Sequence, residues 1–342
     1  MARDSRIRFL RLLDATHPGL RTAFLASMAQ VRSNIAMQAL EQAIARGDVQ
    51  AAFDALRIDQ AALYALDEAI VAAFVAGGRY QMDSVVTATR RFPQGRRIVQ
   101  SFGGRNERAE RIARDLGSRL VTEVVDDTRA MVAQTIRGGL ELGQNPRRTA
   151  LDITGRMVSG RRQGGLVGLH SQQAGYVQNM RRELTDPATM RNYFTRGRRD
   201  RRFDGLVRRA IAEGRPVAQV DIDRIAGRYS DRLLNLRGER IARTETLKSL
   251  NAGRQEGIDQ LIDNGRITAA QVQRKWDATG DARTRETHRA ADGQTVSNDE
   301  PFTVGGYRLN YPGDTSLGAS AAETVNCRCY FEPVIDYFAG LT

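Results

Sequence analysis

The sequence has very few residues of the types that form disulfides. It contains two cysteines in 342 residues, and they occupy positions 327 and 329. A disulfide across one residue would close a small strained ring and would constrain little of the chain. This scarcity excludes a disulfide-stabilised secreted domain and favours synthesis in a reducing compartment.

Long hydrophobic runs are also lacking. The longest, residues 69–76, is far too short to span a bilayer. The first twenty residues are basic but have neither the continuous apolar core nor the small-residue cleavage site of a secretory signal. We therefore expect a soluble protein without a membrane partner.

Aromatic residues are scarce, at 6% with a single tryptophan, while hydrophobic residues make up 41%. This composition suits helices rich in alanine and leucine better than sheets. The length predicts two or three folding units. The expected fold class is mainly α, with an extended helical N-terminal and middle region and a small C-terminal α+β module.

Lysine is nearly absent, because only Lys248 and Lys275 occur among 52 basic residues, yet the net charge is +12. Arginine binds phosphate and carboxylate through a planar fork of donors. Such an excess favours an anionic partner, most often nucleic acid, although a solvated basic surface is the alternative.

The N-terminal region, residues 1–100, shows two helical patterns. Apolar residues recur at steps of three and four from Leu20 to Arg46, where Gly47 stops the pattern. A second pattern begins at Asp59, a good N-cap, and runs to the glycine pair at 77–78.

The middle region, residues 101–220, begins with a glycine-rich break at 101–106 and continues as a helix that the glycine pair at 138–139 should end. Residues 160–176 are predicted to form a loop or hinge. Seven arginines and two aspartates follow between positions 196 and 209. Such a face could bind DNA phosphates without reading bases, or dock an acidic partner, or remain solvated. The candidate nucleic-acid-binding residues are Arg198, Arg199, Arg201, Arg202, Arg208 and Arg209.

The third region, residues 221–342, begins with the longest helical pattern, from Asp221 to Asn264. Arg240, Thr244, Lys248 and Asn251 form a polar stripe on it, which is either an exposed face or a brace for the next unit. After Trp276, turn pairs separate short strings such as "FTV" and "YRLNY", a pattern typical of a small β-containing unit. At about 60 residues, its hydrophobic core alone would give marginal stability. We therefore expect it to be stabilised by packing on the helix or by a cross-link such as a bound metal.

Several uncommon strings occur here in order: "RIARTET" at 240–246, "KWDATGDARTRETH" at 275–288, "ADGQ" at 291–294, "YPGD" at 311–314 and "NCRC" at 326–329. In this order they resemble the phage Mu protein F-like minor head proteins, also called phage head morphogenesis proteins. The family motif positions are Arg240, Arg243, Thr244, Glu245, Asn251, Trp276, Asp281, Arg283, Asp314 and Glu323.

The resemblance implies a structural protein of a tailed bacteriophage rather than an enzyme. It would be made in the bacterial cytoplasm and incorporated into the virion head. The implied partners are the portal protein, major capsid or scaffold components, and packaged double-stranded DNA.

His288, Cys327 and Cys329 carry three ligands of the kind that Zn²⁺ prefers. Two cysteines one residue apart on an extended segment point to the same face. Asp281 is interpreted as the N-cap of a helix running to His288, and Asp292 or Glu323 is the candidate fourth ligand. Metal affinity would then supply folding free energy to a small unit.

Two alternatives remain open for these residues. Both cysteines could be small buried hydrophobes beside Tyr330 and Phe331, with His288 bonded to a turn carbonyl. Alternatively, His288 with an acidic neighbour could serve a metal-dependent hydrolase or an effector delivered with phage DNA. The sequence lacks the common hydrolase and phosphate-binding motifs, which favours the structural role.

Overall fold

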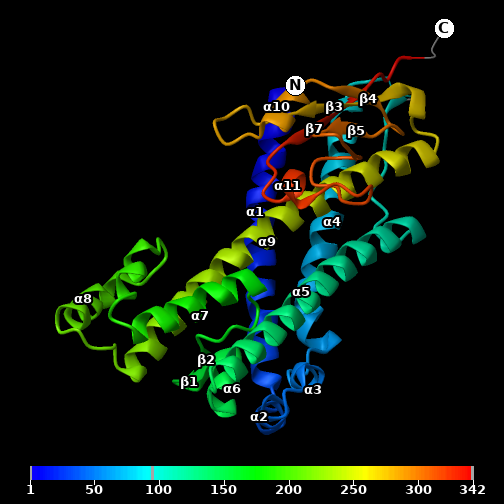
Figure 1. Cartoon of the computed structure of the whole chain (residues 1–342). Helices are drawn as coiled ribbons and strands as arrows, with labels where there is room; N and C mark the ends of the chain where they lie inside the picture. Colours follow the sequence, from blue (N-terminus) through cyan, green and yellow to red (C-terminus); the bar gives the residue numbers. More distant parts are fainter. Residues whose placement is uncertain (1, 94–95, 340–342) are drawn as a thin grey trace. The chain divides into compact units, whose positions relative to one another are not determined.

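The computed structural model describes residues 2–93 and 96–339, and their fold is mainly α with a small strand-containing module near the C-terminus, as predicted (Figure 1). The chain forms two compact units. Unit 1 comprises Met1–Thr22, Leu66–Ser118 and Arg240–Thr342, and unit 2 comprises Ala23–Ala65 and Arg119–Glu239. These units do not follow the three consecutive regions proposed from the sequence, because helices α1, α4, α5 and α9 each contribute residues to both.

The helices and strands have the following bounds. The α-helices are α1 (Ala2–Asn34), α2 (Met37–Ala45), α3 (Val49–Asp54), α4 (Gln60–Thr89), α5 (Glu107–Glu141), α6 (Pro146–Thr154), α7 (Ser171–Thr185), α8 (Asp204–Ala212), α9 (Gln219–Asp263), α10 (Glu286–Ala290) and α11 (Ala321–Thr324). Short 3₁₀ helices are η2 (Met190–Thr195), η3 (Arg201–Phe203) and η4 (Ala269–Gln271). The strands are β1 (Arg156–Val158), β2 (Arg161–Gln163), β3 (Val272–Asp277), β4 (Thr295–Ser297), β5 (Phe302–Val304), β6 (Tyr307–Leu309) and β7 (Tyr330–Ile335).

Side-chain caps fix several helix starts. The Asp59 carboxylate accepts a hydrogen bond from the Ala62 amide, which confirms its predicted capping role. Asn106 caps α5 through the Ala109 amide. The single helix expected from Leu20 to Arg46 is instead broken at 35–36, where the Ala36 amide bonds the Ala55 carbonyl rather than continuing α1.

The glycine pairs do not end helices as predicted, because α4 continues through residues 77–78 and α5 through residues 138–139. In unit 1, a Cβ on Gly77 would lie 2.0 Å from the Leu250 carbonyl oxygen, and a Cβ on Gly253 would lie 1.9 Å from the Phe74 oxygen. These glycines therefore let the backbones of α4 and α9 touch, and they permit a close helix crossing.

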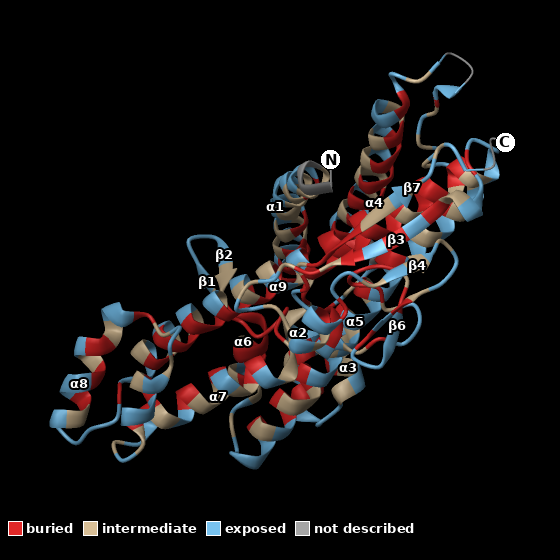
Figure 2. Cartoon of the chain, turned by 90° about the horizontal axis from the view of Figure 1, so that it is seen from above, coloured by how far each residue is buried: buried red, intermediate tan, exposed pale blue. Residues whose placement is uncertain are grey.

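α4 is long and apolar enough to cross a membrane by length and composition, with a mean hydropathy of 1.5 in its window within residues 61–89. The sequence argument missed this because it counted only uninterrupted apolar residues. Of that window, 44% is buried inside the protein (Figure 2).

The C-terminal module contains a three-stranded antiparallel sheet in the order β4-β3-β7 and a separate β5-β6 hairpin. Trp276 of β3 is fully buried and contacts the rings of Phe302, at 5.3 Å, and His288, at 5.7 Å between centroids. The sheet thus packs against α10 through Trp276 and continues, in β7, from the segment that contains the two cysteines.

The polar stripe of α9 braces this module. The Asn326 amide donates to Thr244 Oγ1 at 3.0 Å, and Asn251 Nδ2 donates to the Pro312 carbonyl at 3.0 Å. Lys248 is buried beside its helical neighbour Glu245, 3.4 Å away, and its Cα lies 3.5 Å from where a Cβ on Gly313 would sit. The structure supports the brace for Thr244, Lys248 and Asn251, whereas Arg240 is exposed.

A buried arginine connects α9 with the first residues of the chain. The Arg254 guanidinium lies 4.1 Å from the Phe331 ring centroid, 4.4 Å from that of Tyr330 and 4.8 Å from that of Phe9. It donates to the Phe331 carbonyl and to Asn251 Oδ1. Cation–π contacts and hydrogen bonds stabilise this charge in the core of unit 1.

In unit 2, the segment predicted to form a loop or hinge, residues 160–176, contains an irregular stretch at 164–169 that is buried. Arg32 donates to the carbonyls of Gly165 and Val167, and Arg237 donates to that of Gly168. Gly164, at φ +74°, has no room for a side chain, because a Cβ would lie 2.3 Å from Gly227 Cα. Buried guanidinium groups thus satisfy the carbonyls of a segment that has no regular structure of its own.

Candidate metal centre and basic surface

The structure brings His288, Cys327 and Cys329 together in the C-terminal module. His288 lies on α10, and the cysteines occupy the segment between α11 and β7. Asn326 adopts φ +55°, a left-handed conformation that asparagine tolerates, and so reverses the chain immediately before Cys327. This turn sets both sulfur atoms on the side that faces α10.

The three potential ligand atoms form a compact group. His288 Nδ1 lies 3.2 Å from Cys329 Sγ and 3.7 Å from Cys327 Sγ. All three ligand atoms lie within 4.8 Å of one another, and all three residues are buried. In tetrahedral zinc sites, bond lengths near 2.0 and 2.3 Å place nitrogen and sulfur ligands about 3.5 Å apart. The observed separations lie on either side of this value, so the donor set fits such an ion.

Glu323 faces the opposite nitrogen of the same ring. Its Oε2 lies 3.0 Å from His288 Nε2, although without the alignment of a full hydrogen bond, and it accepts a bond of 2.8 Å from Thr287 Oγ1. A carboxylate in this position orients the imidazole and favours a lone pair on Nδ1, which points at the two sulfur atoms. Glu323 therefore lies where it supports the histidine rather than where it would be a fourth ligand.

The other two acidic residues considered for this site lie elsewhere. Asp292 Oδ1 accepts a hydrogen bond of 2.8 Å from the amide of Ala278, the first residue after strand β3. Asp281 is not the N-cap expected for it, because α10 begins only at Glu286. Its oxygens accept two 2.6 Å bonds from Arg328, and this pairing holds the pKa of Asp281 well below its usual range. Asp281 thus fastens the turn before α10 to the cysteine segment.

The two thiols are electrostatically coupled. Hydrogen bonding between them lowers the pKa of Cys327 and raises that of Cys329, and burial adds to the increase at Cys329. The two adjacent thiols can lose one proton more easily than both, because two neighbouring thiolates would repel each other. A bound cation would offset this repulsion. Since the cysteines are 4% and 2% exposed, a substrate could not reach them without local opening.

The remaining motif residues build the scaffold. The Asp314 carboxylate accepts from the amides of Asn310 and Ser316 and so closes the "YPGD" turn. Arg283 is 78% exposed in its side chain and lies 3.8 Å from Asp281. Arg240 is exposed, and Arg243 has interactions within the protein.

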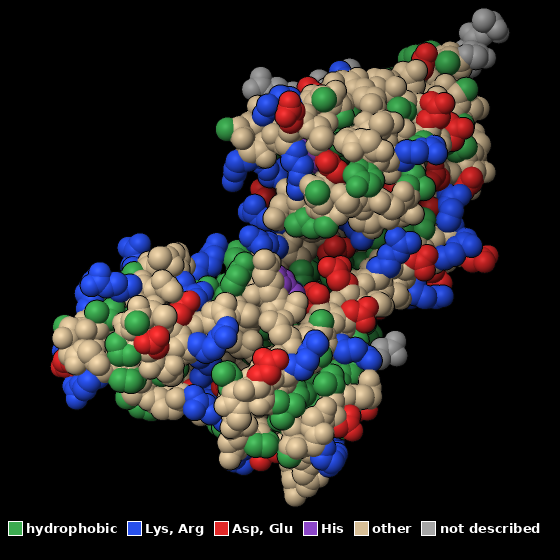
Figure 3. Space-filling model, viewed as in Figure 1, with side chains coloured by type: hydrophobic (Ala, Val, Ile, Leu, Met, Phe, Trp, Pro, Cys, Tyr) green, Lys and Arg blue, Asp and Glu red, His purple; other side chains and the backbone are tan. Residues whose placement is uncertain are grey.

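The basic segment of unit 2 separates into paired and exposed arginines. Arg199 makes a bidentate pair with Asp204 and is 14% exposed in its side chain, whereas Arg202 pairs with Asp200 and is 73% exposed. Arg208 lies 4.0 Å from Asp204. Arg198, Arg201 and Arg209 are exposed and have no carboxylate within 4 Å among the described residues. Figure 3 shows arginine side chains gathered over the α8 part of unit 2.

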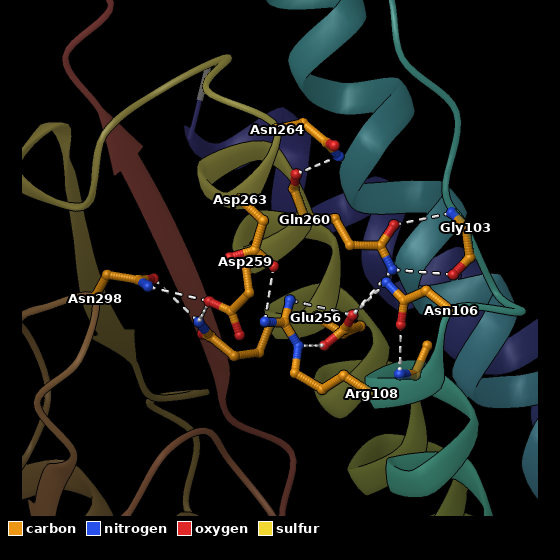
Figure 4. A network of polar contacts seen from close by, with 11 residues as sticks. Gly103, Asn106, Arg108, Glu256, Asp259, Gln260, Asp263, Asn264 and Asn298 are labelled. Carbon is orange, nitrogen blue, oxygen red and sulfur yellow. Dashed lines mark hydrogen bonds and ion pairs between the residues drawn. The ribbon is translucent and has the colours of Figure 1, made fainter.

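A polar network in unit 1 went unnoticed in the sequence (Figure 4). Arg108 bonds the buried carboxylate of Glu256 at 2.7 Å and that of Asp263 at 2.8 Å. Gln260 exchanges two hydrogen bonds with the backbone of Gly103. The only signal available was the i, i+3 and i+4 spacing of polar residues on the last turns of α9, a spacing that also occurs on solvated helices.

Comparison with known proteins relates the chain to phage head proteins. Residues 202–332 match the family described as phage Mu protein F like protein. The minor head protein GP7 of Bacillus phage SPP1 is 34% identical over 130 residues, which cover 37% of this chain and 39% of that protein. The NAD(+)–arginine ADP-ribosyltransferase EFV of Enterococcus faecalis (strain ATCC 700802 / V583) is 37% identical over 97 residues, which cover 28% of this chain and 18% of that protein.

The chain spans less than two fifths of the length of either relative, and no solved structure matches it. The matched family region contains the long helix α9, the candidate metal centre and the strand-containing module, which are the parts that carry the motif strings. The resemblance predicted from these strings is therefore confirmed over residues 202–332, where the chain is similar to the phage Mu protein F-like family.

Proposed function

We propose that this protein is a structural minor head protein of a tailed bacteriophage that acts in head assembly at the portal vertex. The similarity to the minor head protein GP7 over 130 residues carries the proposal. The protein would be made in the host cytoplasm and incorporated into the virion head, with the portal protein and major capsid or scaffold components as partners.

Co-expression with the portal protein of the same phage tests this role. The two proteins should co-purify through affinity capture of either one and then through size exclusion. The major capsid protein alone, expressed in the same way, is the control for non-specific capture by a basic chain. Failure of the portal protein to co-purify, while the chain itself is folded, would remove the portal assignment.

In this role, the exposed arginines around α8 contact packaged double-stranded DNA. Arg198, Arg201 and Arg209 are free of carboxylate partners among the described residues, so their charge is available to phosphates. Arg199 holds Asp204 and supports the local fold instead, and Arg202 and Arg208 are partly neutralised by Asp200 and Asp204. Binding should therefore depend on the three exposed arginines and fall steeply with salt.

We propose that Zn²⁺ binds His288 Nδ1, Cys327 and Cys329 and stabilises the C-terminal module. The burial of all three residues supports a structural ion over a catalytic one, because a catalytic ion needs an open position that substrate can reach. The fourth ligand is not identified by the side chains around the group. Glu323 acts through His288 as a positioning residue.

A second candidate function is that of a metal-dependent hydrolase or effector delivered with phage DNA. One observation favours it: the Glu323 carboxylate lies 3.0 Å from His288 Nε2, where it could orient this imidazole as a general base. The burial of His288 and of the two thiols opposes it. Activity abolished by Glu323→Gln without loss of metal or stability would support the enzyme.

A further inference from the structure

The connector between α4 and α5, residues 90–106, carries a second basic surface that the α8 arginines do not explain. Arg90, Arg91, Arg96 and Arg97 are exposed and have no carboxylate within 4 Å among the described residues. The segment contains no acidic residue, and the nearest acid on the adjacent C-terminal segment, Asp336, accepts from the amides of Phe338 and Ala339. The surface is therefore strongly positive and belongs to unit 1.

Aromatic rings lie among these arginines. The Phe92 ring contacts those of Tyr337, at 5.6 Å, and Phe338, at 5.1 Å between centroids. The Arg96 guanidinium lies 5.7 Å from the Phe338 ring centroid. Phe338 is nevertheless 52% exposed, so much of its ring is open to solvent. An exposed ring flanked by guanidinium groups can stack a nucleobase.

The described parts of the connector, residues 90–93 and 96–106, have little regular structure but are held by defined contacts. The Ile98 side chain is buried, and its amide donates to Thr89 Oγ1 at 3.1 Å. Arg97 Nε donates to the Phe92 carbonyl at 2.9 Å. The arginines and the ring are therefore presented in a defined arrangement, which lowers the entropic cost of binding a ligand.

A polar cavity of about 460 Å³ follows directly along the connector. It is lined by Gln100, Ser101, Gly103, Asn106, Gln260, Asn264 and Arg266. Gln100 Oε1 is buried without a hydrogen-bond partner in the described structure, so it can accept a bond from a ligand. Arg97 and Gln100 are separated by at most about 11 Å of chain, so one short ligand can contact both the connector arginines and the cavity.

We propose that this surface binds single-stranded nucleic acid, with phosphates on the arginines, a base on Phe338 and base-edge hydrogen bonds in the amide-lined cavity. A duplex cannot use the ring or the cavity, because its bases are already stacked and paired. An acidic peptide would use the charge but has no nucleobase to stack on the Phe338 ring. The inference goes beyond the proposed head role and does not depend on the α8 surface.

Fluorescence anisotropy with a labelled 12-nucleotide oligothymidine tests this inference on the full chain. Phe338→Ala should weaken binding about tenfold. Replacing Arg96 and Arg97 with glutamine should reduce the slope of log K against log salt by roughly 1.4. Two controls should leave the oligothymidine affinity unchanged: Tyr307→Ala removes an exposed aromatic elsewhere in unit 1, and glutamine at Arg198 and Arg201 removes charge near α8.

Equal affinities of the Phe338→Ala and Tyr307→Ala variants for oligothymidine would overturn the proposal. Equally effective competition by a glutamate dodecapeptide at the same charge concentration would also overturn it and would indicate an acidic protein partner. A 20-base-pair duplex, assayed in parallel, reports on the α8 arginines instead. If the wild-type chain binds oligothymidine but not the duplex, the DNA contact proposed for α8 is refuted and this inference stands.

Discussion

Replacing Gly253 with alanine should strongly destabilise unit 1. The added Cβ would lie 1.9 Å from the Phe74 oxygen and 2.8 Å from the Gly78 nitrogen, and both atoms belong to the backbone of α4. Ordinary contact begins near 3.4 Å, so the two helices must separate by about 1.5 Å. Overpacking of this kind costs about 3 kcal/mol, and the better helix propensity of alanine returns about 1 kcal/mol. The net expectation is a loss of about 2 kcal/mol.

Thermal unfolding followed by circular dichroism measures this effect, and a loss of about 2 kcal/mol should lower the melting temperature of unit 1 by roughly 4–8 °C. Two other glycines provide controls. Gly257→Ala, on the same helix, would place a Cβ 3.2 Å from the Gly78 oxygen and should cost much less. Gly138→Ala, with nothing within 4 Å, should be neutral or should add up to about 1 kcal/mol. If the Gly253→Ala protein melts at the wild-type temperature, the close crossing of α4 and α9 is wrong.

Three further predictions concern the candidate sites. Elemental analysis should find one Zn²⁺ per chain. The His288→Ala and Cys327→Ser variants should lose the ion and be less stable, whereas Asp292→Asn should retain it. A wild-type protein that contains no metal and is equally stable with and without chelator would contradict the proposed zinc site. Duplex DNA retention should fall with salt and weaken when Arg198, Arg201 and Arg209 become glutamine, whereas retention that responds to neither change would end the proposed contact. The Arg202 guanidinium lowers the pKa of Asp200 to about 2, below its ordinary value of 3.8. The ionised carboxylate therefore stabilises unit 2 above about pH 4, and this contribution to the free energy of unfolding is lost as the pH falls towards 2. Acid titration followed by circular dichroism should show this loss in the wild type and not in Asp200→Asn, and identical acid profiles would refute it.

The sequence predicted the helices well where the apolar period was long or a cap was present. α9 and the helix that starts after Asp59 are examples, because period and cap chemistry are local properties of the chain. It failed at the glycine pairs of α4 and α5. The sequence does not distinguish a glycine that ends a helix from one that permits close contact with a neighbouring helix. For Gly77, the distinction depends on Leu250, which lies far along the sequence.

For the candidate metal site, the sequence predicted which residues come together but not how they are oriented. The rarity and spacing of His288, Cys327 and Cys329 pointed to one cluster, which the structure assembles. The orientation of the imidazole was not predictable, because it depends on Glu323 reaching the opposite nitrogen across a turn. The division of the arginines into paired and exposed sets also required the structure, since Arg198 and Arg199 are adjacent in sequence yet differ in whether a carboxylate faces them.

The discontinuity of unit 1 has a consequence for how the chain acquires its structure on the ribosome. Ser5 bonds the Tyr330 hydroxyl, Arg6 pairs with Asp277, and Phe9 lies against Tyr330, so these contacts of the first helix must wait for residues made more than 250 positions later. At bacterial synthesis rates, residues 240–342 alone take about 5–20 s to appear. During that interval the part of the first helix that these C-terminal residues cover in the folded chain stays exposed. A fragment limited to residues 202–332 would lack these partners altogether, so the family region of this protein should be soluble and ordered only together with its N-terminal helix.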